Sequence, residues 1–233
     1  MKTWIILLCL TITFTMSAQD DFSISAYANF EKYAADNERL GLPKENEKRV
    51  VFMGNSITEA WVNFSPKFFS DNNYIGRGIS GQVTHQMLLR FRADVIALNP
   101  KAVVILAGTN DIAQNAGPVS LEEIAGNIKS MAELALKNNI RVVLCSVLPA
   151  KDYPWKPNMN PLEKIPKLNK MLFDYTQRKP NVFYIDFYEA MVDDEGGLKV
   201  PKYTSADDLV HPNKAGYDMM EALIQRFMPV IVN

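Results

Sequence analysis

The sequence predicts a three-layer α/β/α sandwich built on a five-stranded parallel sheet. Short apolar runs of strand length alternate with longer segments of helical periodicity, which is the pattern of a mostly parallel sheet covered on both faces. The length of 233 residues suits one well-buried α/β domain and is short for two. Right-handed crossovers then favour the flavodoxin-like strand order 2-1-3-4-5.

The N-terminus is expected to be a signal peptide. Lys2 precedes an apolar run of about ten residues, and a polar stretch begins after Ala18, which is the order of regions in a secretory signal. The run is too short to cross a bilayer, which takes about twenty apolar residues, and a buried strand or helix is the less favoured alternative. Cys9 lies inside the run after a leucine, so lipidation is not expected. We predict a signal peptide over 1–19, a single domain over 20–233, and a secreted or periplasmic location.

Composition argues against several classes of partner. The formal net charge is −1 and there is no basic run, so neither nucleic acid nor an anionic membrane surface is expected to bind. Without the signal peptide Cys145 is the remaining cysteine, which rules out an internal disulfide and favours a buried core position. The two histidines lie far apart in the sequence, so we expect no metal and no cofactor. Nothing in the sequence indicates an oligomeric state.

The first part of the chain contains two predicted strands, each followed by a helix. An N-terminal helix is expected over 21–40, ending at a Gly-Leu-Pro sequence. The strand over 49–53 leads into a helix from near Ile57, and the strand over 74–79 leads into a helix over 83–98. Apolar residues recur at helical spacing in the last of these segments.

The second part of the chain repeats the alternation three times. Ser120 is followed three residues later by Glu123, a capping box that marks a helix start. The proline-rich segment 149–161 is expected to be an irregular loop. The predicted strands are 101–108, 142–147 and 182–187, and the predicted helices are 121–137, 161–179 and a final helix that ends at Met228.

Ser56 is the candidate nucleophile because it directly follows the first strand. The carboxyl edge of an open α/β sheet is where catalytic side chains gather. A serine hydroxyl needs a base, and a histidine oriented by a carboxylate is the usual solution. His211 has Asp208 three residues before it, whereas His85 has no carboxylate nearby in sequence. His85 is therefore expected on a helix surface or in the substrate cleft.

An acyl-transfer site also needs donors for the oxyanion of its tetrahedral intermediate. The backbone N–H of Ser56 is one candidate if a helix begins just after it. Gly81 can turn its N–H into the cleft without a Cβ in the way, and Asn110 offers a side-chain NH₂ at the end of the third strand. Each residue alone is a weak signal because glycine and asparagine are common in turns, but their order together is specific.

These residues resemble the pattern of the SGNH hydrolases, also called GDSL-type esterases and lipases. The resemblance rests on four blocks: Gly54-Asn-Ser-Ile-Thr58, Gly78-Ile-Ser-Gly81, Gly108-Thr-Asn-Asp111 and Asp208-Leu-Val-His-Pro-Asn213. It implies the SGNH hydrolase fold and assigns the roles residue by residue. The implied nucleophile is Ser56, the general base His211, the orienting acid Asp208, and the oxyanion hole Ser56, Gly81 and Asn110.

Two positions depart from the family pattern. Asn55 stands where aspartate commonly precedes the serine, and Leu209 stands where glycine usually follows the aspartate of the last block. The first change affects local hydrogen bonding, and the second predicts a shift of loop shape. Asp207 is the alternative to Asp208, and the family spacing favours Asp208. Two further aspartates are expected to be structural: Asp111 in its own loop and Asp186 at the end of the last strand.

The resemblance implies a serine esterase that acts through an acyl-enzyme on Ser56. The expected substrate is an acetyl or other short acyl ester outside the cytoplasm, on a small molecule or, more specifically, on carbohydrate. A lysophospholipase or acyl thioesterase is the alternative enzyme, and an inactive glycan-binding protein is the alternative from another class. Four aromatic residues are candidates to stack on sugar rings, although each is more often a packing residue: Trp61, Tyr153, Trp155 and Tyr203.

Overall fold

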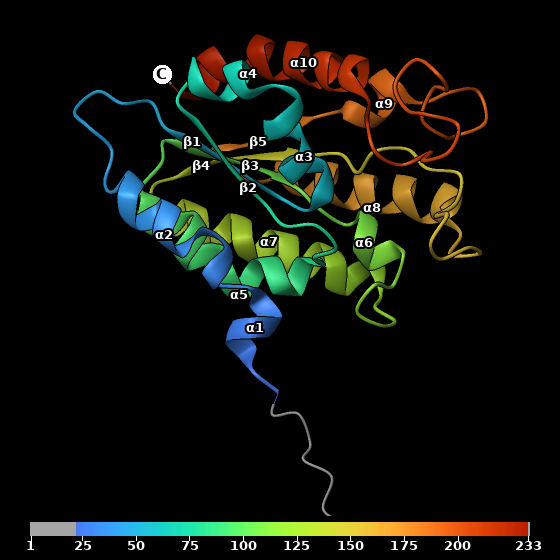
Figure 1. Ribbon diagram of the computed structural model, residues 1–233, viewed down its shortest axis with the longest axis horizontal. Helices are drawn as coiled ribbons and strands as arrows, with labels where there is room; N and C mark the ends of the chain where they lie inside the picture. Colours follow the sequence, from blue (N-terminus) through green and yellow to red (C-terminus); the bar gives the residue numbers. More distant parts are fainter. Residues whose placement is uncertain (1–21, 233) are drawn as a thin grey trace, which may run out of the picture.

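The computed structural model describes residues 22–232, which form a five-stranded parallel sheet between two layers of helices (Figure 1). The strand order is β2-β1-β3-β4-β5, which confirms the predicted order. The expected signal peptide over 1–19 lies outside the described residues. The strands are β1 (Val50–Gly54), β2 (Tyr74–Gly78), β3 (Ala102–Leu106), β4 (Arg141–Cys145) and β5 (Val182–Ile185).

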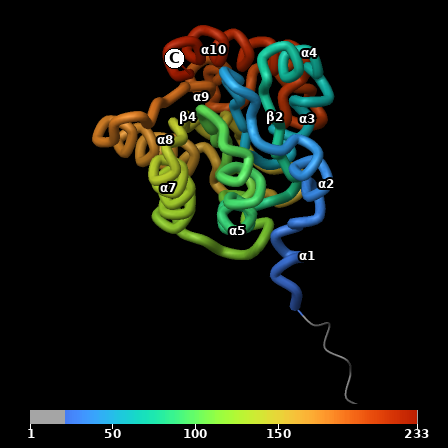
Figure 2. Tube along the Cα trace, turned by 90° about the vertical axis from the view of Figure 1, so that its left-hand side faces the viewer, coloured from blue at the N-terminus to red at the C-terminus, as the bar shows by residue number. Residues whose placement is uncertain are grey.

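The helices divide between the two faces of the sheet, as Figures 1 and 2 show. One layer contains α3 (Ser56–Phe64), α4 (Pro66–Ser70), α9 (Phe187–Met191) and α10 (Lys214–Val232). The other contains α1 (Ile24–Ala28), α2 (Glu31–Leu40), α5 (Thr84–Asp94), α6 (Thr109–Ile112), α7 (Leu121–Lys137) and α8 (Pro161–Thr176). A short 3₁₀ helix, η1 (Ile96–Leu98), follows α5.

The two layers bury two apolar cores, one on each face of the sheet. Side chains alternate along β1, so that Val51 and Met53 belong to one core while Val50 and Phe52 belong to the other. All five residues of β1 are buried, and so are those of β3, because helices cover both faces. Trp61 lies 1% exposed in the second core, with its ring centroid 5.5 Å from that of Phe52.

Two outward-facing carbonyl groups of the edge strand β2, those of Gly76 and Gly78, are bonded to side chains. Asn73 O accepts from Val50 N and Ile79 N donates to Gly54 O, so the odd-numbered residues of β2 face β1 and the even-numbered ones face away. Arg77 Nη1 donates to Gly76 O at 2.7 Å, and the Tyr33 hydroxyl donates to Gly78 O. The Arg77 guanidinium also lies over the Tyr33 ring, 4.7 Å from its centroid.

The predicted N-terminal helix over 21–40 is wrong in one respect, because the structure has two helices there. Asn29 adopts φ 54°, in the left-handed region, and its N–H caps the carbonyls of Ser25 and Ala26. Asparagine tolerates this conformation better than most residues, so α1 ends and the chain turns before α2. The predicted helix over 83–98 is likewise divided, into α5 and η1.

Other predicted elements agree with the structure to within a few residues. The capping box of Ser120 and Glu123 begins α7, and the segment 149–161 is irregular until α8 begins at Pro161. Cys145 is buried, and burial raises the pKa of its thiol well above the usual range. The helices α4, α6 and α9 were not predicted, because four or five residues are too few to show helical periodicity. Among residues 22–232, no helix combines the length and apolar character needed to cross a membrane.

Candidate active site

Ser56, His211 and Asp208 form a continuous hydrogen-bonded chain at the carboxyl end of β1. The Ser56 Oγ lies 2.9 Å from His211 Nε2. On the other side of the imidazole, Nδ1 lies 2.9 Å from Asp208 Oδ1 and 3.1 Å from Oδ2. The fold thus brings together a serine and a histidine that are 155 positions apart in the sequence, as a triad requires.

The turn between β1 and α3 fixes the position of Ser56. A Cβ at Gly54 would lie 2.0 Å from Thr58 Oγ1, so a larger residue would push the strand and helix apart. Asn55 caps α3, because its side-chain oxygen accepts from Ile57 N at 3.1 Å. The departure from aspartate at this position therefore preserves the cap. Ser56 is the first residue of α3, where backbone N–H groups have no partner within the helix.

The turn from Asp208 to His211 is built around one carboxylate oxygen. Asp208 Oδ1 accepts from the main-chain N–H groups of Val210 at 3.1 Å and His211 at 2.8 Å, in addition to its contact with the imidazole. Burial would raise the pKa of Asp208, but the hydrogen bonds from His211 and Val210 and the charge of His211 outweigh it and lower that pKa. Leu209 adopts φ 65°, in the left-handed region. Asp207 is exposed, and it is Asp208 that faces the histidine.

The two other candidate oxyanion residues leave the sheet beside Ser56. Gly54 pairs with Gly78 of β2 and with Leu106 of β3, so the loops that follow these strands start side by side. Gly81 has φ 79°, and a Cβ there would meet no atom within 4 Å, which leaves its surroundings open. Asn110 is buried and donates one hydrogen of its amide to Gln82 O at 3.0 Å. An amide NH₂ has two donors, so this bond orients the group and leaves one donor for a ligand.

The remaining polar candidates have structural contacts. Asp111 accepts from Thr84 N at 2.9 Å and from the Thr84 hydroxyl at 2.5 Å. It is thus structural, as expected, but its side chain ties α6 to the start of α5 instead of stabilising its own loop. Burial raises the pKa of Asp111. Asp186 caps α9 by accepting from Glu189 N. His85 lies on α5, stacks on the Tyr27 ring and shares a hydrogen bond with its hydroxyl.

Of the four aromatic candidates, only Trp155 is available to a substrate. Trp61, Tyr153 and Tyr203 are all buried, so they have the packing role that is the favoured interpretation for each, and they do not stack on sugar rings. Trp155 is 45% exposed, and its ring centroid lies 6.2 Å from that of His211. Its Nε1 donates to Asn115 Oδ1 at 3.0 Å, which ties the indole to the loop that follows α6.

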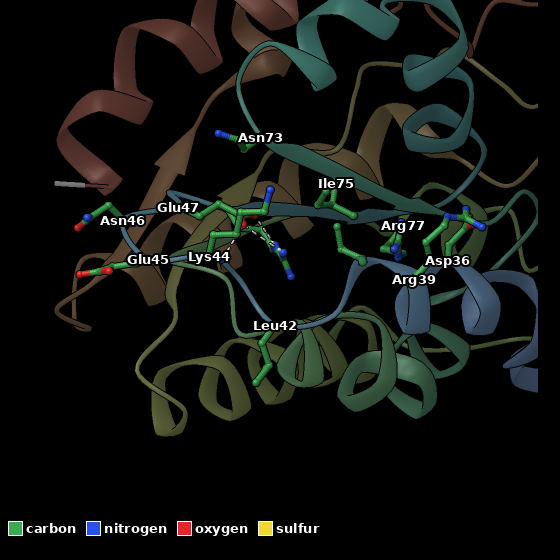
Figure 3. Close-up of a pocket in the computed structure, with 12 residues that line it drawn as sticks. Asp36, Arg39, Leu42, Lys44, Glu45, Asn46, Glu47, Asn73, Ile75 and Arg77 are labelled. Atoms are coloured by element: carbon green, nitrogen blue, oxygen red, sulfur yellow. Dashed lines mark hydrogen bonds and ion pairs between the residues drawn. The ribbon is translucent and has the colours of Figure 1, made fainter.

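A hollow of about 770 Å³ lies beside the start of β2, and none of the triad residues lines it. Figure 3 shows the side chains around this hollow. Its charged residues mainly pair with one another: Arg49 Nε lies 2.8 Å from Glu47 Oε1, and Arg39 pairs with Asp36. Arg49 also donates to the carbonyls of Gly41 and Leu98. These contacts hold the connection between α2 and β1. None of the described residues that line the hollow is a serine or a histidine.

Residues 52–219 match the family model described as GDSL-like Lipase/Acylhydrolase family. The chain belongs to this family. A solved structure of a putative acylhydrolase from Bacteroides fragilis is 49% identical, covers 88% of this chain and 98% of its own, and superimposes with a TM-score of 0.84. Together with the family match, this likeness identifies an SGNH-type, ester-hydrolysing enzyme, and it confirms the resemblance drawn from the sequence blocks.

Two curated proteins are more distant relatives of this GDSL-like enzyme. The Drosophila melanogaster protein named platelet-activating factor acetylhydrolase IB subunit beta homolog is 27% identical over 162 residues, 66% of this chain and 67% of that protein. An uncharacterized lipoprotein of Bacillus subtilis is 32% identical over 95 residues. This match spans 39% of the chain and 39% of the lipoprotein's length.

Proposed function

We propose that this enzyme is a secreted serine esterase and that Ser56 is its nucleophile. The observation that carries the proposal is the unbroken chain from Ser56 Oγ through the imidazole of His211 to Asp208. His211 Nε2 takes the hydroxyl proton as Oγ attacks the ester carbonyl carbon. The same proton then passes to the departing alcohol, which leaves an acyl group on Ser56. Water, activated by His211, releases the acid and restores the serine.

The carboxylate of Asp208 keeps the imidazole in the tautomer that this step needs. It accepts the hydrogen on Nδ1 and so leaves Nε2 unprotonated toward Ser56. The lowered pKa of Asp208 supports this role, because the group stays ionised in neutral solution. The proposed donors to the oxyanion are the N–H groups of Ser56 and Gly81 and the second amide hydrogen of Asn110.

The proposed substrate is an acetyl or other short acyl ester on carbohydrate. Trp155 supports a sugar ligand, since its exposed ring lies beside His211 and aromatic faces pack on the apolar faces of sugars. The Drosophila relative carries the name of an acetylhydrolase, which supports the short acyl group. The predicted signal peptide and the lipoprotein relative support a site of action outside the cytoplasm.

Hydrolysis of p-nitrophenyl acetate and p-nitrophenyl octanoate tests the nucleophile and the acyl chain together. Wild type is expected to prefer the acetyl ester, and Ser56→Ala is expected to lose activity by about 10⁴-fold or more because no other group replaces the hydroxyl. Activity that survives in Ser56→Ala would contradict the assignment of Ser56 as the nucleophile. A clear preference for octanoate would favour the lysophospholipase or thioesterase alternative instead.

Acetate release from a panel of acetylated glycans tests the carbohydrate proposal. Trp155→Ala is expected to raise KM for a productive glycan by about tenfold, roughly the loss of one stacking contact, and to leave KM for p-nitrophenyl acetate within about twofold. Phe173→Ala, a substitution of an exposed aromatic residue on α8, is the matched control. An equal effect of Trp155→Ala on both substrates would argue against sugar stacking.

A further inference from the structure

The two N-terminal helices lie outside the residues that match the family, yet they hold the loop that carries Gly81. The match begins at residue 52, and α1 and α2 end before it. The Tyr33 hydroxyl on α2 donates to Gly78 O. Lys32 pairs with Glu59 at 2.7 Å, and Glu59 accepts from Ser80 N at 2.7 Å. These contacts hold the part of the loop that precedes Gly81. The contacts of α1, described next, hold the part that follows it.

The short helix α1 offers its last carbonyl groups to this loop. The final carbonyls of a helix have no partner within the helix, and α1 ends at Ala28 with Asn29 as its C-cap. Gln82 Nε2 donates to Ala28 O at 2.9 Å, and Gln86 Nε2 donates to Tyr27 O at 2.9 Å. The break that divides the N-terminal segment into two helices therefore creates the acceptors that these two glutamines use.

The side-chain oxygens of the two glutamines have different partners. Gln86 Oε1 accepts from Val83 N at 3.1 Å, at the start of α5, whereas Gln82 Oε1 contacts the buried core. Arg90 Nε donates to Gln82 Oε1 at 2.6 Å. The same guanidinium donates to Gly54 O at 3.0 Å, two residues before Ser56, and to Asp94 Oδ2 at 2.8 Å. Arg90 is fully buried, so its bonds are made without competition from water. One cation thus links the turn before Ser56 to the loop after Gly81.

The main chain of Gln82 reaches the third proposed oxyanion residue. Its carbonyl accepts from Asn110 Nδ2 at 3.0 Å, and this bond sets which way the remaining amide hydrogen points. Gln82 is itself 4% exposed. The side-chain amide of Gln82 donates to Ala28 O and accepts from Arg90 Nε. These two bonds fix the residue, and with it the main-chain carbonyl that accepts from Asn110.

We propose that Gln82 is a positioning residue of the oxyanion hole, and that α1 is one of its two anchors. The proposal rests on the serine esterase function proposed above. A Cβ at Gly81 would meet no atom within 4 Å, so none of the described residues packs against the loop on that side of Gly81. Oxyanion donors accelerate acyl transfer only if they are preorganised where negative charge develops. Gln82 holds Gly81 in position as its neighbour in the chain, and it orients the Asn110 amide through its main-chain carbonyl.

The test compares Gln82→Met with Gln86→Met, which gives up an equivalent bond to α1 and also the acceptor for Val83 N. Both variants are expected to unfold at a lower urea concentration. For Gln82→Met, kcat on p-nitrophenyl acetate is expected to fall by about ten- to a hundredfold with KM within about twofold, because misplaced donors weaken the transition state more than substrate binding. For Gln86→Met, kcat is expected to stay within about twofold of wild type. Equal losses of kcat in the two variants would show general loosening and overturn the proposal.

Two more variants complete the test. Gln82→Glu keeps the side-chain length and the acceptor for Arg90 and loses the donor to Ala28, so its kcat is expected to lie between those of wild type and Gln82→Met. If Gln82→Met does not fold, Gln82→Glu replaces it in the test. A kcat of Gln82→Glu equal to that of wild type would then overturn the proposal. In an Asn110→Ala background, Gln82→Met is expected to cost much less than it does alone, because the amide that its carbonyl orients is gone. Independent, multiplicative losses would contradict action through Asn110.

Ser56→Ala separates this proposal from the one on which it rests. If Ser56→Ala retains activity, the serine esterase mechanism fails and the kinetics of Gln82 variants have no bearing on an oxyanion hole. If Ser56→Ala is inactive while Gln82→Met and Gln82→Glu keep the kcat of wild type, the mechanism stands and the positioning role alone fails.

Discussion

Asp208 combines two tasks in a single side chain. Its Oδ1 accepts two main-chain N–H groups and closes the turn, and the same carboxylate contacts the imidazole Nδ1. Such hydrogen bonds favour the ionised form, which is why the pKa of Asp208 is lowered despite partial burial. The side chain therefore connects the geometry of the turn to the chemistry proposed for His211.

Asp208→Asn is expected to lower kcat by about 10³–10⁴-fold, because asparagine favours the wrong imidazole tautomer. It is also expected to change how stability depends on pH. The folded-state pKa lies below the ordinary value of 3.8, so ionised Asp208 stabilises the fold above that pH and loses this contribution as pH falls through the folded-state pKa. The difference in free energy of unfolding between wild type and variant should thus shrink from pH 7 to pH 3 in urea titrations.

Asp207→Asn is the matched control for this prediction. Asp207 is the exposed neighbour of Asp208, and its substitution is expected to leave kcat within about twofold, as is usual for surface positions. A large loss of kcat in Asp207→Asn would mean that the alternative aspartate orients the histidine.

At the scale of elements, the turn 208–211 shows how a departure from the family pattern is accommodated. The family usually has glycine where this chain has Leu209, and the left-handed φ of 65° explains that preference. Leucine adopts the same conformation here at a cost. The hydrogen bonds of Asp208 hold the turn in place despite that cost, so the predicted shift of loop shape does not separate Asp208 from His211.

Leu209→Gly is expected to raise the free energy of unfolding by about 0.5 kcal/mol. Relief of the left-handed leucine gains about 1–2 kcal/mol, and the greater freedom of glycine in the unfolded chain removes about 0.4–1 kcal/mol of it. Leu209→Val is the contrasting variant, because a β-branched residue fits this region poorly, and it should destabilise. Urea denaturation measures both. A loss of stability in Leu209→Gly would show that contacts of the leucine side chain outweigh the backbone strain.

The elements also show what sequence reasoning reaches and where it stops. Buried strands such as β1 and β3 are visible as apolar runs, and the capping box at Ser120 marks the start of α7. The break at Asn29 was missed because one asparagine does not interrupt helical periodicity. The bonds of Gln82 to Ala28 and Arg90 were missed because side-chain hydrogen bonds between distant elements leave no periodic signal.

At the scale of the whole molecule, the two apolar cores and the parallel sheet bring four sequence blocks to one edge. The blocks that carry the resemblance predicted the site because each follows a strand or precedes a helix. The sequence alone could not distinguish the aromatic residues that can stack on a sugar from those that pack in the interior, because the exposure of each side chain decides its role. Only the structure shows that Trp155 lies beside His211 while Trp61 packs against Phe52.

Export of the enzyme is a prediction that depends on the first residues of the chain. Expressed with residues 1–233, the protein is expected outside the cytoplasm with its first 18 to 20 residues removed, because the positive start, apolar run and small residue form a cleavable signal. Mass spectrometry of the exported protein would detect a species lighter than the full 26.3 kDa chain. Recovery of the uncleaved chain from the cytoplasm would contradict the proposed location.

The occupied edge of β2 bears on how the enzyme behaves at high concentration. An open sheet ends in strands whose free backbone groups can pair with a second molecule, which is a common route to aggregation. Here an incoming strand would find Gly76 O and Gly78 O already bonded to Arg77 and Tyr33. It would also have to displace a cation that is almost fully buried. The side chains of Tyr33 and Arg77 therefore make pairing between the β2 edges of two copies less favourable.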